Sequence, residues 1–164
     1  MAATAPVRPG GLRVIHGDAV QALQQGYIDI LGHQVNLRGV MGTGIAKQIK
    51  NVYPTVFSVY RETVTTQDLA LGSVQLIRVG PSRWVANIAG QDGYGSGRQT
   101  DYAAFRTAIQ KLADLVDGTS LRVGLPYGIG CGHAGGSWST IERILLEELP
   151  EATLYRLGGA GHRF

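Results

Sequence analysis

Residues 28–52 read IDILGHQVNLRGVMGTGIAKQIKNV, an apolar run followed by a glycine-rich loop and an amphipathic segment. The run at 28–35 is mostly apolar and β-branched, which predicts a short strand buried on both faces. In residues 44–52 the apolar side chains recur at helical spacing while the lysines point elsewhere, so we expect a helix there. A buried strand that leads into a helix through a loop is the unit from which α/β domains are built.

The rest of the chain continues this alternation. Gly80-Pro81-Ser82 separates two strand-like runs and predicts a hairpin. Ser139 and Glu142 have the spacing of a capping box, which predicts that the last helix begins at Ser139. Between Asp18 and Ile28 we expect only a polar, glutamine-rich connection. The predicted strands are 12–16, 28–35, 74–79, 84–88, 121–125 and 153–157, and the predicted helices are 44–52, 54–64, 101–116 and 139–149.

These elements predict a single α/β domain. Alternating strands and helices favour a three-layer α-β-α sandwich with a mixed, largely parallel sheet. The chain has 164 residues, 44% of them hydrophobic, which suits one domain with a sizeable core. Residues 1–11 contain two prolines and small side chains, so we expect a flexible tail there and the domain in residues 12–164.

Composition argues against several classes of protein. No window approaches the roughly 18 uninterrupted apolar residues of a spanning helix, and residues 1–10 lack an apolar signal core. Cys131 is the only cysteine, which excludes an internal disulfide and agrees with a reducing compartment. The net charge of +3 arises from scattered lysines and arginines, so a nucleic-acid patch is not indicated. We therefore expect a cytoplasmic monomer that binds a phosphorylated small molecule and contacts no membrane.

The loop at residues 39–46 lies between the predicted strand and helix, where anions bind. A helix start offers unpaired N–H groups and the positive end of the dipole, and glycine lets a phosphate approach them. A Walker A loop is excluded because Ile45 and Ala46 follow Gly44 where lysine and a hydroxyl residue are needed. A dinucleotide fingerprint fits poorly, since the acid about 20 residues on, Glu62, lies in a predicted helix.

A second glycine loop, residues 126–136, follows the strand at 121–125. Five glycines lie between Gly128 and Gly136, more than one turn needs. Glycine in a regular element costs about 0.5 to 1 kcal/mol, so their concentration favours backbone contact with a ligand. Two such loops at the carboxyl ends of strands can hold a pyrophosphate from both sides.

Four pieces of sequence, in this order, resemble a known family. They are Gly17-Asp18, Asn36 with residues 39–46, residues 87–91 (NIAGQ), and residues 125–132 (LPYGIGCG) with Gly135, Gly136 and Trp138. From Leu12 to Leu157 the chain resembles the macrodomain family, in the branch of terminal ADP-ribose protein glycohydrolase and the phage and bacterial ADP-ribose-1''-phosphate processing proteins. The resemblance implies a hydrolase that removes ADP-ribose from modified acidic side chains, with ADP-ribose and ADP-ribosylated proteins as partners and no cofactor.

The resemblance also implies a role for each part of the site. Asp18 is expected to accept a hydrogen bond from the adenine amino group, although capping the turn after the first strand is an alternative role. Asn36 is expected to hold the distal ribose. The other implied contacts are Ala19 and Leu157 near adenine; Met41, Gly42, Thr43, Gly44, Ile45 and Ala46 around the ribose and diphosphate; and Tyr127, Gly128, Ile129, Gly130, Cys131, Gly132 and His133 over the diphosphate.

The catalytic groups of the human-type glycohydrolase are missing from this chain. Its lysine falls near Gly90 and its aspartate at Ala134, so a lysine-linked sugar intermediate is not expected. An ester to ADP-ribose is activated, and a positioned water can suffice for its hydrolysis. We therefore expect Asn36 to orient the ribose while His133 or Asp92 activates water. A solvent-exposed loop histidine and an Asx turn are the respective structural alternatives.

Other readings of the sequence remain open. A phosphatase for ADP-ribose-1''-phosphate and a module that binds ADP-ribose without turnover fit the same resemblance. No metal is predicted, because His16, His33, His133 and His162 lack ligand spacing and no second cysteine exists. Cys131 is expected to be a small buried packing residue rather than a nucleophile.

Overall fold

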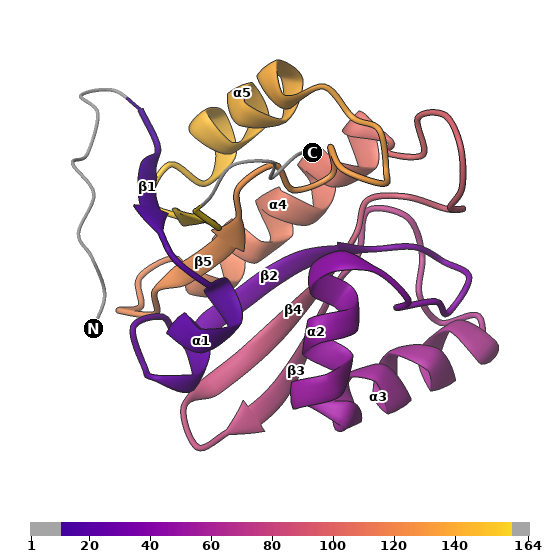
Figure 1. Cartoon of the computed structure of the whole chain (residues 1–164), viewed down its shortest axis with the longest axis horizontal. Helices are drawn as coiled ribbons and strands as arrows, with labels where there is room; N and C mark the ends of the chain where they lie inside the picture. Colours follow the sequence, from indigo (N-terminus) through magenta and orange to yellow (C-terminus); the bar gives the residue numbers. More distant parts are fainter. Residues whose placement is uncertain (1–10, 159–164) are drawn as a thin grey trace.

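The computed structural model describes residues 11–158, in which a six-stranded sheet lies between two layers of helices (Figure 1). The strand order is β1-β6-β5-β2-β4-β3, and every neighbouring pair is parallel except the β3–β4 hairpin. This confirms the α/β class and the mixed, largely parallel sheet. The strands are β1 (Arg13–His16), β2 (Ile30–Val35), β3 (Val74–Gly80), β4 (Arg83–Ala89), β5 (Val123–Pro126) and β6 (Thr153–Arg156).

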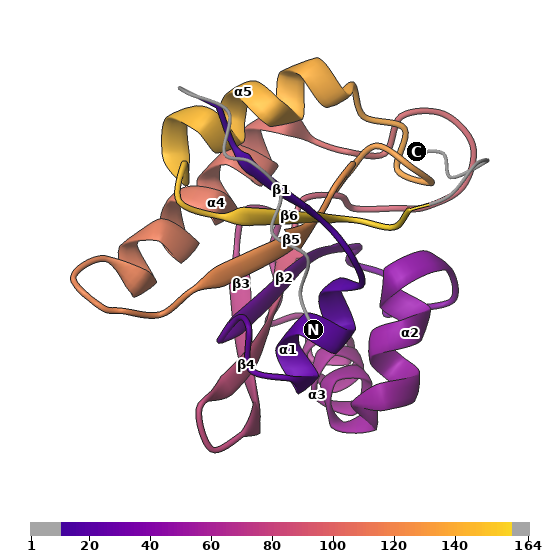
Figure 2. The ribbon, with the colours of Figure 1, turned by 60° about the vertical axis from the view of Figure 1, so that its left-hand side comes forward.

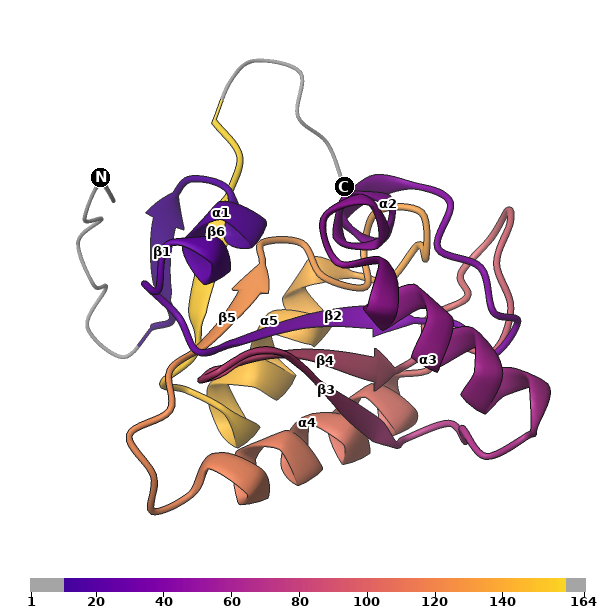
Figure 3. The same ribbon diagram turned by 90° about the horizontal axis from the view of Figure 1, so that it is seen from below.

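The helices divide between the two faces of the sheet, which Figure 2 shows most clearly. Helices α1, α2 and α3 cover one face, and α4 and α5 cover the other, with α4 packed along β3 and β4 (Figure 3). Each layer buries its own apolar cluster against the sheet. The helices are α1 (Ala19–Gln24), α2 (Gly44–Val52), α3 (Pro54–Thr65), α4 (Tyr102–Val116) and α5 (Trp138–Glu148).

Strand β2 is buried on both faces, as its apolar run predicts. Leu31 and Val35 belong to the cluster under α1, α2 and α3, whereas Ile30 belongs to the cluster under α4 and α5. Successive side chains of a strand point to opposite faces, so Gln34 lies on the α4 and α5 side. At Gly32 a Cβ would come within 2.6 Å of Leu125, which is why glycine is needed there.

Two sequence predictions are wrong. The segment after Asp18 is the helix α1 rather than a polar connection; Asp18 caps it by accepting hydrogen bonds from Val20 N and Gln21 N. The helix α5 begins at Trp138, with Ser137 as its N-cap, so Ser139 and Glu142 form no capping box. The backbone N–H of Ser137 donates instead to the Tyr102 hydroxyl at 2.8 Å, which fixes the chain before the helix.

Residues 1–10 of the expected tail, and the end of the chain, residues 159–164 with His162, lie outside the described residues. Between residues 11 and 158, no helix is long and apolar enough to cross a lipid bilayer. Leu12, the first predicted residue of the domain, is buried in the core.

Candidate functional site

The carboxyl ends of five parallel strands meet at one edge of the sheet, and a cavity of about 690 Å³ lies along this edge. Neighbouring strands are about 4.8 Å apart, so the edge from β1 to β4 spans roughly 19 Å. The strand order fixes the order of the lining. Asp18 follows β1, Leu157 follows β6, the second glycine loop follows β5, Asn36 and the first glycine loop follow β2, and Gln91 follows β4.

Asp18 lies at the β1 end of the cavity, where two helices hold its carboxylate. Its Oδ1 accepts from Val20 N at 2.8 Å and Gln21 N at 3.1 Å, which caps α1. The side-chain amide of Gln48, on α2, donates to Oδ1 at 3.1 Å and to Oδ2 at 2.8 Å. Asp18 therefore caps a helix, where the sequence suggested a capped turn after the first strand, and it also lines the cavity.

Asn36 shapes the turn between β2 and the first glycine loop. Its Oδ1 accepts from Arg38 N at 2.9 Å, and its Nδ2 donates to Val40 O at 2.9 Å. The Tyr60 hydroxyl lies 2.7 Å from both Oδ1 and the main-chain oxygen of Asn36. Burial raises the pKa of Tyr60 to about 12, so the hydroxyl stays a donor. Asn36 is thus held rigidly, with one amide hydrogen not used by Val40.

The first glycine loop leads into α2, and the N–H groups of the first turn of this helix lack helical hydrogen-bond partners. Thr43 is the N-cap but its side chain makes no capping hydrogen bond. Gly44 has φ +58, a left-handed conformation that favours glycine. The N–H groups of the first turn have no intrahelical partner and carry the positive end of the helix dipole. Because Gly44, Ile45 and Ala46 line the cavity, these donors are available to an anion there.

The second glycine loop presents donors from the opposite side. Gly128 and Gly130 have φ of +81 and +76, and both line the cavity with Gly132. Among residues 11–158, the N–H groups of these three glycines donate to no other residue. The loop is fixed at its start by Tyr127 N, which donates to Tyr155 O at 2.9 Å, and later by Gly136 N, which donates to Gly130 O at 2.9 Å. Two sets of unpaired N–H groups therefore border one cavity.

Gln34 and Thr100 support the second glycine loop through a chain of hydrogen bonds. Gln34 Nε2 donates to Gln91 Oε1 at 2.8 Å and to Thr100 Oγ1 at 2.9 Å. Thr100 Oγ1 in turn donates to Gly130 O at 2.7 Å. Gln34 Oε1 is buried without a partner in the described part of the chain, close to where a Cβ on Gly90 would lie. This network joins β2, the segment after β4 and the loop after β5.

The far half of the second loop reaches the segment after β4. Gln99 N and Thr100 N donate to Ala134 O at 2.7 and 3.2 Å, so the neighbouring His133 lies toward the β4 end of the cavity. His133 is solvent-exposed and lines the cavity. Tyr94 also lines the cavity, and 60% of this residue is exposed. It lies between two glycines, Gly93 and Gly95, and Gly95 has a positive φ.

Three residues expected at the site do not line the cavity. Met41 is buried among the apolar residues beneath α1, α2 and α3. Cys131 is packed in the opposite core cluster, and burial raises the pKa of its thiol to about 11, which disfavours a thiolate. Asp92 forms an exposed ion pair with Arg38 at 3.2 Å, and its main-chain oxygen accepts from Leu37 N.

Most of the other expected residues do line the cavity, and several unexpected ones join them. Among the described lining residues Asp18 is the only carboxylate, and none is lysine or arginine, so an anion would be held by neutral backbone donors. No group of three metal-ligating side chains occurs in residues 11–158. The expected residues that line the cavity are Asp18, Ala19, Asn36, Gly42, Thr43, Gly44, Ile45, Ala46, Tyr127, Gly128, Ile129, Gly130, Gly132, His133 and Leu157. The lining residues that were not predicted as site residues include Gln34, Gln48, Gln91 and Tyr94.

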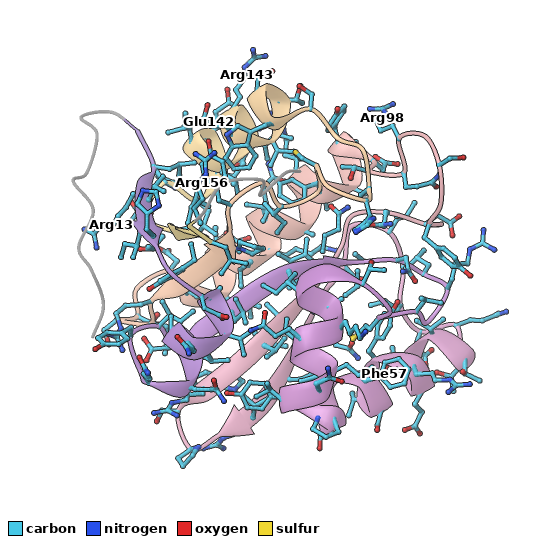
Figure 4. The ribbon with its side chains drawn as sticks, in the orientation of Figure 1. Arg13, Phe57, Arg98, Glu142, Arg143 and Arg156 are labelled. Atoms are coloured by element: carbon cyan, nitrogen blue, oxygen red, sulfur yellow. The ribbon has the colours of Figure 1, made fainter. Side chains whose placement is uncertain are left out.

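An arginine and two aromatic rings contact one another beside the second glycine loop. The Arg156 guanidinium, labelled in Figure 4, lies 4.5 Å from the centre of the Tyr127 ring. The Tyr127 ring is 4.6 Å from that of Trp138, centre to centre. These contacts orient Tyr127 at the lining of the cavity between β5 and β6.

Neither the protein-family models nor the curated proteins gave a match to the chain. Solved structures do resemble it. A protein of unknown function from Bacteroides thetaiotaomicron shares 31% sequence identity, covering 88% of this chain and 96% of that chain, with a TM-score of 0.79. A macrodomain protein from Streptomyces coelicolor shares 28% identity, covering 80% of this chain and 89% of that chain, with a TM-score of 0.68.

A third structure adds a bound nucleotide sugar. Thermosipho africanus DarTG, solved in complex with ADP-ribose, is 19% identical to this chain and has a TM-score of 0.73. The match covers 94% of this chain and 43% of that chain. All three structures share the fold described above.

Proposed function

Because this chain belongs to the macrodomain family, we propose that it binds ADP-ribose along the carboxyl edge of its sheet and releases ADP-ribose from modified acidic side chains. One observation carries the binding proposal: N–H groups from two glycine loops, unpaired within residues 11–158, border the same cavity. Backbone donors and a helix N-terminus bind diphosphate without a cationic side chain. The ADP-ribose complex of the DarTG neighbour supports the same ligand.

The order of strands suggests how the ligand lies. The diphosphate is expected between the loops after β2 and β5, near the middle of the edge. Adenine then extends toward Asp18, whose carboxylate accepts from an amino group. The distal ribose extends toward Asn36, Gln91 and Tyr94.

For the hydrolytic step we assign His133 rather than Asp92 as the group that assists water. His133 lines the β4 end of the cavity, whereas Asp92 lies outside it and is paired with Arg38. In this reaction the bond from the anomeric carbon to the ester oxygen breaks and the acidic side chain leaves as a carboxylate. The water oxygen bonds to the anomeric carbon, and a neutral imidazole accepts its proton.

Binding without turnover is the second candidate. It is favoured by the lining itself: among residues 11–158, Asp18 is the only carboxylate there, and the strands β6 and β5 separate it from Asn36. In that case the domain would recognise ADP-ribosylated proteins rather than modify them. A phosphatase for ADP-ribose-1''-phosphate would share the site but yield inorganic phosphate.

Incubation with glutamate-ADP-ribosylated protein separates these functions. We expect free ADP-ribose to appear, and calorimetry to show one ADP-ribose bound per chain. Binding with no release above buffer would select the non-catalytic module, and no binding would defeat the proposal as a whole.

Two variants separate the candidate bases. We expect His133→Ala to slow release at least about tenfold while ADP-ribose still binds, because a general base contributes at least that much. Asp92→Ala serves as the matched control and should keep nearly full activity. Full activity in His133→Ala would remove this histidine from the mechanism.

A further inference from the structure

The carboxylate of Asp18 is held by residues from two different helices. Its Oδ1 accepts from two backbone N–H groups of α1, at 2.8 and 3.1 Å. Gln48, thirty residues away on α2, donates through Nε2 to Oδ1 at 3.1 Å and to Oδ2 at 2.8 Å. Asp18 and Gln48 both line the cavity.

The two helices restrain different atoms of this carboxylate. A carboxylate offers about four acceptor positions, and the three donors on Oδ1 leave it little capacity for a ligand. Oδ2 accepts only from Gln48 within residues 11–158, so it can accept from a ligand. The terminal torsion of an aspartate is broad, so capping through Oδ1 alone leaves Oδ2 poorly directed. The bond from Gln48 removes this freedom.

Gln48 also connects this end of the cavity to the first glycine loop. Gly44 and Gln48 are four residues apart and therefore lie on the same face of α2. Gly44 begins the helix whose open N–H groups border the cavity. One helix face thus carries both the expected diphosphate donors and the amide that fixes Asp18.

We propose that Gln48 is a positioning residue that directs Asp18 Oδ2 toward the base of the bound nucleotide and so favours a base that carries an exocyclic amine. This inference rests on the proposed binding of ADP-ribose. A carboxylate only accepts hydrogen bonds, so an amine on the base can donate to Oδ2, whereas a base without this amine leaves that acceptor position unfilled. Without Gln48, Asp18 still caps α1 but no longer holds Oδ2 in one direction.

Two ligands that differ only at this position of the base provide the test. ADP-ribose carries an amine there, and its analogue with an unsubstituted purine base carries only a hydrogen atom. We expect calorimetry on the full chain to give at least about tenfold tighter binding of ADP-ribose, because the analogue lacks a hydrogen bond to a charged group. In Gln48→Leu we expect this ratio to fall below about threefold, chiefly through weaker ADP-ribose binding.

Two further variants complete the experiment. Gln48→Glu keeps the side-chain length and helix propensity but removes the donor and adds a like charge, so its ratio should fall as well. Gln25→Leu changes an exposed glutamine that follows α1 and should leave the ratio unchanged. Melting by circular dichroism checks that each variant is folded.

The outcomes are distinguishable. Equal weakening for both ligands in Gln48→Leu would mean a purely structural role and would overturn the inference, as would unchanged binding of both. A wild-type protein that binds neither ligand would overturn the proposed function together with it.

Discussion

Glycines in the two loops differ in what a side chain would meet. At Gly42 a Cβ would have Val40 as its nearest neighbour, at an ordinary 3.7 Å, and Gly42 has no positive φ. At Gly136 a Cβ would come within 2.6 Å of Gly130 O. Gly42 can therefore be enlarged without disturbing the fold, whereas Gly136 cannot.

A valine at Gly42 should separate ligand binding from folding. We expect Gly42→Val to weaken ADP-ribose binding by about tenfold or more, since the loss of one or two hydrogen bonds to a charged group has this size. Its melting temperature should stay close to that of the wild type. Gly80→Val, in the distant β3–β4 hairpin, is the matched control for calorimetry. Unchanged affinity in Gly42→Val would count against the first glycine loop as a ligand site.

His33 should make the fold sensitive to acid. Its Nε2 lies 2.6 Å from Asn87 Oδ1, while Nδ1 has no partner in the described part of the chain. Desolvation by complete burial lowers the pKa of His33 to about 4. An unfolded histidine has a pKa near 6.5, so below this pH the unfolded state takes up a proton that the folded state refuses.

The free energy of unfolding should therefore fall by about 2 kcal/mol between pH 6.5 and pH 5 on account of His33. Urea denaturation across this range measures the loss. His33→Leu should flatten the dependence. An identical pH profile in the variant would show that other groups are responsible.

At the level of single residues, sequence predicted the backbone part of the site better than its side chains. The glycine loops and Asp18 line the cavity, as predicted. They could be predicted because glycine in a turn and aspartate at a helix start reflect local backbone geometry. Met41 and Cys131 lie in the same loops but point into the core, since a loop sequence does not tell which side of the chain faces the ligand. Gln34 and Gln48 act through partners at least 30 residues away, which spacing cannot reveal.

Among the elements, the loop after β5 depends on its support from β2. Thr100 is almost fully buried and links Gln34 to Gly130 O. Thr100→Val removes both hydrogen bonds at nearly constant volume. We expect it to lower the free energy of unfolding by about 1 to 3 kcal/mol and to weaken ADP-ribose binding, because the loop loses an anchor.

Urea denaturation and calorimetry test this support. Thr107→Val, which removes only an exposed hydroxyl bonded within α4, is the control and should change neither quantity much. Thr100→Val with wild-type stability and affinity would show that the network is dispensable.

Element boundaries were predictable where a pattern extends over several turns. The bounds of α2 agree with the prediction because its apolar spacing, glycine start and Tyr53-Pro54 end all coincide. Helix α1 was missed because six residues are too few to show a period. The start of α5 was predicted one residue late, since contact with Tyr102, 35 residues away, fixes Ser137 outside the helix.

For the whole molecule, alternation of elements predicted the layers but not the strand order. That order places Asp18 and Asn36, which follow strands that begin 17 residues apart in sequence (Arg13 and Ile30), three strand positions apart on one edge, with β6 and β5 between them. Only packing of the complete sheet decides this.

The arrangement predicts weak dependence of binding on salt. No described residue lining the cavity is lysine or arginine, so few exposed ion pairs to the phosphates are available for screening. ADP-ribose affinity should change less than about threefold between 50 and 500 mM salt. A loss of tenfold or more in calorimetry would point to cationic side chains instead.

The most direct measurement is a crystal structure of this chain with ADP-ribose. We expect phosphate oxygens within hydrogen-bond distance of N–H groups in both loops, residues 42–46 and 128–133, with the base toward Asp18. A diphosphate bound by one loop alone, or outside the cavity, would contradict this expectation.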